Sequence, residues 1–110
     1  MALIHFDETT FQEALNAGVP VLVDFWATWC THCRPLTAVM EQLAEDYAED
    51  DVIIGKVDVD QCPELAIRYG VMGVPTVLLL QGGEEKERKV GAMPYDAYAE
   101  LLDAAVGSGT

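Results

Sequence analysis

The chain has 110 residues, a length that fits a single domain over residues 1–110 and allows about two-thirds of the unfolded surface to be buried. Hydrophobic residues make up 51% of the chain, and no apolar stretch approaches the ~20 residues of a membrane span, so we expect a soluble globular protein. The net charge of −13, with only six Lys and Arg, argues against nucleic acid or an anionic membrane as a partner, because phosphate binding needs clustered basic side chains.

The N-terminus carries no recognisable targeting segment. Residues 1–8 lack the basic start, the apolar stretch and the small-residue cleavage site of a secretory signal. The three cysteines are also fewer than a disulfide-stapled secreted protein of this size usually has. We therefore expect a cytoplasmic protein.

A strand and a helix are expected at the start of the chain. Residues 3–6 are apolar enough for a short strand. Thr9 with Gln12, or Thr10 with Glu13, can form a capping box, in which each side chain accepts a hydrogen bond from the backbone of the other residue. The sequence therefore predicts that a helix opens here.

Two apolar runs are the expected central strands of a sheet. Residues 21–26 are apolar except for Asp24, and residues 52–59 alternate in part between apolar and polar. Between these runs, apolar residues recur at helical spacing and predict a long helix with Cys30 and Cys33 at its N-terminus. The spaced apolar residues are Met40, Leu43, Ala44 and Tyr47.

The second half of the chain continues the alternation of helix and strand. Residues 63–69 suit a short helix and residues 76–80 a strand, and the glycines within 81–84 indicate a hairpin turn. Residues 85–90 then return as a charged edge strand, and residues 95–105 have the apolar spacing of a last helix before a frayed glycine-rich tail. This alternation predicts an α/β layered fold.

The most informative motif is Cys30-Thr31-His32-Cys33. Two cysteines separated by two residues can close a disulfide across one helical turn, and a helix that begins there directs its amide groups at the first sulfur and stabilises the thiolate. The alternatives are a structural disulfide or half of a zinc site. Zinc is disfavoured because it needs about four ligands and the chain has no second motif of this kind.

Several motifs together resemble the thioredoxin family over nearly the whole chain. They are residues 23–30, Cys33, Lys56, Gly73-Val74-Pro75-Thr76 and Val90-Gly91-Ala92. The resemblance implies a thioredoxin fold, with a central five-stranded mixed sheet flanked by four helices. It also implies the reduction of protein disulfides by a monomer that has no bound cofactor and receives electrons from a flavin-dependent thioredoxin reductase.

The resemblance assigns roles to four residues near the motif. Cys30 is expected to attack the substrate disulfide, and Cys33 to resolve the resulting mixed disulfide. The apolar neighbours of Asp24 indicate a desolvated carboxylate with a raised pKa, which can take the proton from Cys33, through a water molecule. Lys56 resembles the lysine that partners this acid, and the alternative is a lysine that snorkels to the surface.

The resemblance also indicates a surface for substrates. An X-Pro bond is cis in only about 5% of cases, so the sequence alone favours a trans Val74–Pro75 bond, whereas the family implies a cis bond beside the thiols. Val74 is then expected to pair its backbone with the substrate in a strand-like way. The residues expected to complete an apolar surface around Cys30 are Trp29, Gly73, Gly91 and Ala92, for each of which turn geometry or packing is the alternative.

The chain departs from the usual thioredoxin pattern at two places, between the cysteines and at the start of the following helix. Most family members have Gly-Pro between the cysteines, where this chain has Thr31-His32; His32 can stabilise the thiolate and make the disulfide more oxidising, or can be a solvated spacer. Pro35 is expected in about the second helical turn, where it should remove a hydrogen bond and bend the start of the helix.

Cys62 is either a regulatory thiol of low pKa or a small, partly buried residue.

We therefore predict a protein-disulfide reductase, and two other functions stay open. His32 favours a disulfide oxidase or isomerase, which the missing secretory signal disfavours. A thioredoxin-fold subunit could also bind clients through the Val74 surface without turnover.

Overall fold

The computed structural model describes residues 3–107, which form a mixed sheet of five strands flanked by four helices. The strands are β1 (Ile4–His5), β2 (Val21–Trp26), β3 (Ile53–Asp58), β4 (Thr76–Gln81) and β5 (Glu84–Val90). The helices are α1 (Glu8–Leu15), α2 (Cys33–Asp46), α3 (Pro63–Arg68) and α4 (Tyr95–Gly107). The expected fold class is confirmed, and the last three residues of the expected tail lie outside the described residues.

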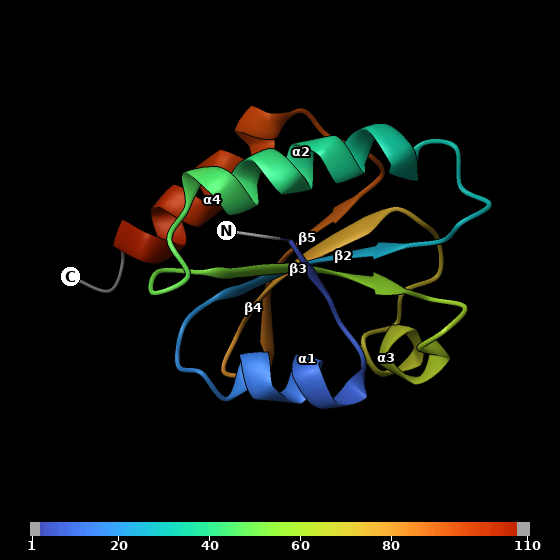
Figure 1. Ribbon diagram of the computed structural model, residues 1–110, viewed down its shortest axis with the longest axis horizontal. Helices are drawn as coiled ribbons and strands as arrows, with labels where there is room; N and C mark the ends of the chain where they lie inside the picture. Colours follow the sequence, from blue (N-terminus) through green and yellow to red (C-terminus); the bar gives the residue numbers. More distant parts are fainter. Residues whose placement is uncertain (1–2, 108–110) are drawn as a thin grey trace.

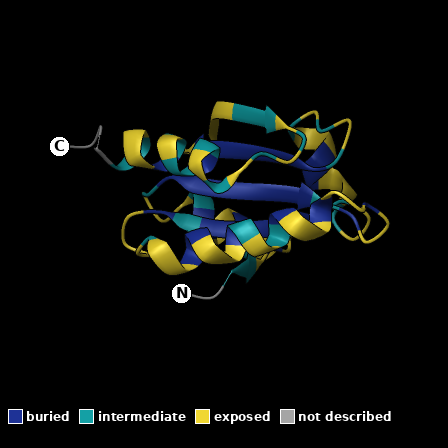
Figure 2. Ribbon diagram, turned by 90° about the horizontal axis from the view of Figure 1, so that it is seen from above, coloured by how far each residue is buried: buried dark blue, intermediate teal, exposed yellow. Residues whose placement is uncertain are grey.

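The sheet has the strand order β1-β3-β2-β4-β5. β3 pairs parallel with both β1 and β2, whereas β4 pairs antiparallel with both β2 and β5. Helices α2 and α4 cover one face of the sheet and α1 and α3 the other (Figure 1). The central strands are buried between these layers, whereas the outer faces of the helices are exposed (Figure 2). None of the helices between residues 3 and 107 is long and apolar enough to cross a membrane.

The alternation of side chains along β2 decides which face each residue serves. Val21, Val23 and Phe25 belong to the core beneath α1 and α3. Leu22 belongs to the core beneath α2 and α4. Since successive strand residues point to opposite faces, Asp24 lies on the same face as Leu22, the face that α2 covers.

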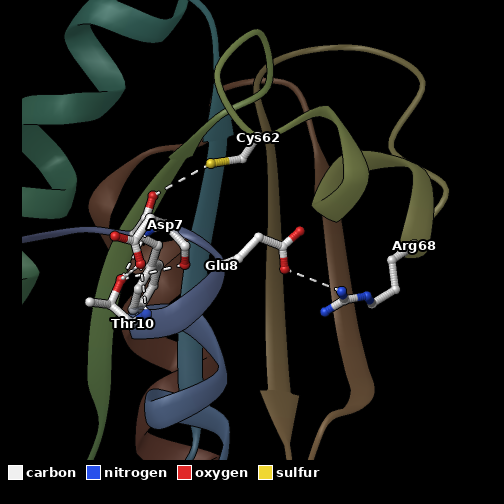
Figure 3. Close-up of polar contacts among 6 residues, drawn as sticks. Asp7, Glu8, Thr10, Cys62 and Arg68 are labelled. Carbon is white, nitrogen blue, oxygen red and sulfur yellow. Dashed lines mark hydrogen bonds and ion pairs between the residues drawn. The ribbon is translucent and has the colours of Figure 1, made fainter.

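The capping box of α1 is displaced from the expected positions. Asp7 is the N-cap: its Oδ1 accepts from the backbone N–H of Thr10 at 2.7 Å, and the Thr10 hydroxyl accepts from the N–H of Asp7 at 2.8 Å (Figure 3). The hydrogen bonds that the backbone N–H and the hydroxyl of Thr10 donate to the Asp7 carboxylate lower the pKa of Asp7. The predicted boxes at Thr9 and Gln12 and at Thr10 and Glu13 are wrong, because a threonine hydroxyl here replaces the usual Glu or Gln.

Helix α2 begins at Cys33, and His32 is its N-cap. Pro35 is therefore the third residue of the helix and not part of the second turn. The first four N–H groups of a helix have no intrahelical partner, so the missing N–H of Pro35 removes no hydrogen bond. The expected loss of a hydrogen bond at Pro35 is therefore wrong, and the expected bend at the start of the helix stays a prediction.

Strand β1 approaches β3 closely at Gly55. Gly55 pairs with Ile4, and a Cβ atom added to it would lie 2.7 Å from Cζ of Phe6 and 2.8 Å from the carbonyl oxygen of Ile4. The buried ring of Phe6 thus occupies the space of the missing side chain. Only glycine fits at this point without movement of the ring or the strand.

Candidate active site

A disulfide joins Cys30 to Cys33 at the point where the chain leaves β2 and enters α2. The two Cα atoms are 5.4 Å apart, and Cys30 is 7% exposed whereas Cys33 is 1% exposed. Cys30 precedes the helix, but its bond to the first helical residue holds its sulfur at the N-terminus of α2. The positive end of the helix dipole favours a thiolate there.

Asp24 is fully buried, and neither of its carboxylate oxygens has a hydrogen-bond partner within the described residues. Burial raises the pKa of Asp24 to about 7, although the positive charge of Lys56 opposes the rise. The expectation of a desolvated carboxylate is thus confirmed. An acid with a pKa near neutrality can both accept and release a proton at physiological pH.

Lys56 is paired with Asp24 in the register of β2 and β3, and its side chain is buried. Its Nζ donates to Oγ1 of Thr37 on α2 at 2.9 Å and lies 3.9 Å from the ring centroid of Trp26. No ion pair among the described residues joins Lys56 to Asp24. Burial lowers the pKa of Lys56. Lys56 is therefore an internal charge that acts on Asp24 through space, which is against the snorkelling interpretation.

The Val74–Pro75 bond is cis, as the resemblance implies and against the bare sequence expectation. Val74 packs against the cluster formed by Ala27, Cys30 and Cys33. Among residues 3–107, neither the N–H nor the C=O of Val74 makes a hydrogen bond. Both groups are therefore free to pair with an extended chain.

A groove of about 100 Å³ lies beside the disulfide. Its lining residues are Trp29, Val59, Val71, Met72, Gly73 and Val74. The side chain of Trp29 is 69% exposed and its Nε1 donates to Oδ2 of Asp60 at 2.9 Å, which holds the indole in place. Met72 is 98% exposed. Large apolar side chains this exposed are typical of protein-binding surfaces.

Some of these residues were not predicted from the sequence. Met72 directly precedes the Gly73-Val74-Pro75 motif, and a methionine at that place was a signal for a contact surface. Val59 and Val71, which line the groove, and Asp60, which binds Trp29, had no such signal, since only the tertiary fold brings them to this place.

The other predicted site residues lie around this centre. Thr31 and His32 are exposed between the cysteines, and the His32 imidazole makes no capping hydrogen bond. The backbone N–H of Gly91 donates to the carbonyl of Pro75 at 2.8 Å, and Ala92 follows as an exposed residue. The structure thus brings the end of β5 next to the cis-proline loop.

Cys62 lies apart from the disulfide, at the start of α3. Its half-buried Sγ lies 3.9 Å from the carbonyl oxygen of Phe6, and an ion pair of Glu8 with Arg68 bridges α1 and α3 nearby (Figure 3). Burial, together with the negative charges of Glu8 and Asp7, raises the pKa of Cys62. The interpretation of Cys62 as a thiol of low pKa is therefore wrong, and it is a small, partly buried residue.

Comparison with known proteins places this geometry in a family. The thioredoxin family model matches residues 2–104. A thioredoxin of Chlorobaculum thiosulfatiphilum is 43% identical over 101 residues, which cover 92% of this chain and 93% of that protein. A thioredoxin of Rickettsia bellii (strain RML369-C) is 44% identical over 97 residues, which cover 88% and 91% respectively.

Solved structures agree with the sequence comparison. A mutant thioredoxin from Halobacterium salinarum NRC-1 superposes with a TM-score of 0.87 at 36% identity, covering 96% of this chain and 91% of that chain. Relatives of this kind, together with the Cys30–Cys33 disulfide, favour a thiol–disulfide oxidoreductase over an isomerase-like protein or a non-catalytic subunit. The chain belongs to the thioredoxin family and is a protein-disulfide reductase of the thioredoxin type.

Proposed function

We propose that Cys30 is the nucleophile and Cys33 the resolving thiol. In the reduced protein, the Cys30 thiolate attacks one sulfur of a client disulfide, forms a mixed disulfide and releases the other client sulfur as a thiolate, which takes up a proton. The Cys33 thiolate then attacks Cys30 and releases the second client thiol, so two electrons pass to the client. The observation that carries the assignment is the disulfide in which Cys30 is the more exposed partner.

Asp24 is the base that prepares Cys33 for the second attack. Its pKa of about 7 lets it take the Cys33 proton at neutral pH, and its position on the face covered by α2 supports this role. Lys56, held by Thr37 and Trp26, supplies the positive charge that keeps the pKa of Asp24 from rising further. A positioning and electrostatic role for Lys56 follows.

Client proteins bind beside the disulfide in an extended conformation. The free N–H and C=O groups of Val74 pair with the client backbone, which gives affinity without sequence specificity. The apolar surface around them covers the client on both sides of its cysteine. This surface consists of Trp29, Gly73, Gly91 and Ala92, and the buried cis Pro75 holds the backbone of Val74 beside it.

The dipeptide Thr31-His32 tunes the reduction potential. A positive charge on His32 at the N-terminus of α2 stabilises the Cys30 thiolate and hence the reduced form. The disulfide is then more oxidising than one with Gly-Pro between the cysteines. The protein still acts as a reductant, because its own partner reduces it again.

The electron donor is a flavin-dependent thioredoxin reductase, and the protein works as a monomer in cellular electron transport and redox homeostasis. The monomer is supported by the presence of both cysteines and the groove in one chain. A cytoplasmic location is supported by the low number of cysteines, since the sequence contains only Cys62 in addition to Cys30 and Cys33.

The test uses insulin as the protein disulfide and compares the wild type with Cys33→Ser and Cys30→Ser. The wild type should reduce insulin with dithiothreitol or with thioredoxin reductase and NADPH. Cys33→Ser should accumulate a mixed disulfide with insulin through Cys30, whereas Cys30→Ser should form none, and mass spectrometry distinguishes the two. If the Cys30→Ser protein instead forms an adduct on Cys33 as fast as the Cys33→Ser protein forms one on Cys30, the assignment is reversed.

A further inference from the structure

The side chain of Arg88 joins β5 to the end of α3. Its Nη1 donates to the carbonyl of Gly70 at 3.3 Å, and its Nη2 donates to the carbonyl of Tyr69. Tyr69 is the C-cap of α3, where unpaired carbonyl oxygens and the negative end of the helix dipole favour a cation. Arg88 thus caps a helix from a different secondary-structure element.

A β-bulge and a carboxylate fix the guanidinium in this position. Leu79 pairs with Glu87 and Leu80 with Glu85, so Lys86 is an extra residue in β5. The extra residue turns Glu85 and Arg88 to the same side of the strand, which three-residue spacing in a regular strand would not. Glu85 then accepts two hydrogen bonds from Arg88, at 2.9 Å from Nε and 2.8 Å from Nη2.

The residue that follows β5 holds the other end of the same loop. The N–H of Gly91 donates to the carbonyl of Pro75 at 2.8 Å. Residues 70–75 are therefore tied to β5 at both ends, by Arg88 at the start and by Gly91 at the finish. Four of the six groove-lining residues, Val71 to Val74, lie between these two ties.

We infer that Arg88 is a positioning residue for protein clients: with Glu85 it anchors the loop that carries the free Val74 backbone and the groove wall of Val71 and Met72. The inference rests on the proposed use of the Val74 surface by clients. Arg88 makes no hydrogen bond to Cys30 or Cys33, so it acts on client binding and not on the disulfide chemistry. A protein client needs the whole loop, whereas a small disulfide needs only the sulfur of Cys30.

The test compares Arg88→Gln, Arg88→Lys and Glu85→Gln with the wild type. Lys86→Gln is the matched control, because Lys86 is a cation of the same strand whose ion pair, with Glu84 at 3.3 Å, does not involve the loop. For each protein, KM and kcat are measured with insulin, together with the rate of reduction of 5,5′-dithiobis(2-nitrobenzoate) and the equilibrium potential in glutathione buffers. All assays are run well below the midpoint of thermal unfolding.

Arg88→Gln should raise KM for insulin about three- to ten-fold, the size that one or two lost hydrogen bonds give, with kcat within about two-fold of wild type. Arg88→Lys should recover part of the loss, since an ammonium still reaches one carbonyl but lacks the fork geometry. The small-disulfide rate and the potential should not change. Hydrogen exchange of the amides of residues 71–74 should become faster in Arg88→Gln and stay at the wild-type rate in Lys86→Gln.

A KM of Arg88→Gln equal to that of Lys86→Gln in folded protein would overturn the inference, as would an equal slowing of the small-disulfide reaction. If Arg88→Gln does not fold, Glu85→Gln, which leaves the arginine but removes the charge and one of the two acceptor oxygens that hold it, decides by the same criteria. Failure of the wild type to reduce insulin would instead refute the proposed function. If the wild type reduces insulin and the Arg88 variants have the same KM for insulin as the wild type, only the role of Arg88 is refuted and the proposed function stands.

Discussion

Replacing Asp24 with asparagine should stabilise the oxidised protein at pH 8 and have little effect at pH 4. The folded protein holds the Asp24 proton up to a pKa of about 7, whereas the unfolded chain releases it near the ordinary value of 3.8. Between these two values the folded state binds more protons than the unfolded state, so the contribution of Asp24 to stability falls as the pH rises. It is fully present below 3.8 and is lost by the time the pH has passed 7.

The size of the effect follows from the two pKa values. Each pKa unit of difference corresponds to about 1.36 kcal/mol, so the interval from 3.8 to about 7 corresponds to about 4 kcal/mol. Asparagine has a similar shape and does not titrate. The free energy of unfolding of Asp24→Asn, minus that of the wild type, should therefore be larger at pH 8 than at pH 4 by about 4 kcal/mol.

Guanidinium chloride titrations of both oxidised proteins at pH 4, 6 and 8 measure this difference. Asp51→Asn is the control, because it makes the same exchange of side chains at an exposed position, in the turn before β3. A difference between Asp24→Asn and wild type that stays constant from pH 4 to pH 8 would show that Asp24 is not desolvated. Asp24→Asn should also release insulin from its mixed disulfide more slowly than the wild type does above pH 7. Unchanged turnover of insulin in this variant would remove Asp24 from the mechanism.

Three further variants test other parts of the structure. His32→Pro should shift the reduction potential in glutathione buffers by at least ~30 mV toward the value of about −270 mV known for thioredoxin, and no shift would leave His32 as a spacer. Gly55→Ala should destabilise the fold by about 1–3 kcal/mol in chemical denaturation, because the new Cβ meets the Phe6 ring, whereas Gly73→Ala, which meets nothing within 4 Å, should not. Met72→Ser should raise KM for insulin with no change in the rate with a small disulfide; equal KM values would place Met72 outside the client surface.

The parts of the fold that local physics decides were predictable from the sequence. The bounds of β2 agree with the prediction, because a continuous apolar run between turn residues has no other stable place than the centre of a sheet. The start of α1 was misplaced, because Asp7 lies outside the apolar spacing and its partner is a threonine. The start of α2 was placed too early, since Cys30 lies near the helix without belonging to it.

The parts of the site that depend on distant segments were not predictable in the same way. The identity of Lys56 was visible in the sequence, but its hydrogen bond to Thr37 depends on how α2 lies across β3. The contacts of Arg88 with Tyr69 and Gly70 depend on a bulge that no local pattern of charges indicates. Such long-range polar contacts follow only once the packing of the elements is known.

Asp24 is the residue at which stability and the proposed function oppose one another. A buried carboxylate without a hydrogen bond weakens the fold above its pKa, and a neutral residue of the same shape would remove that loss. Lys56 lowers the loss in part, yet its Nζ bonds to Thr37 and does not neutralise Asp24 by a direct ion pair. If Asp24 served only to hold the fold together, a direct ion pair with Lys56 or an uncharged residue would serve better. The arrangement instead keeps the pKa of Asp24 near neutrality, the range that the proposed role requires, because a base with such a pKa can take the proton of Cys33 and return it in every cycle.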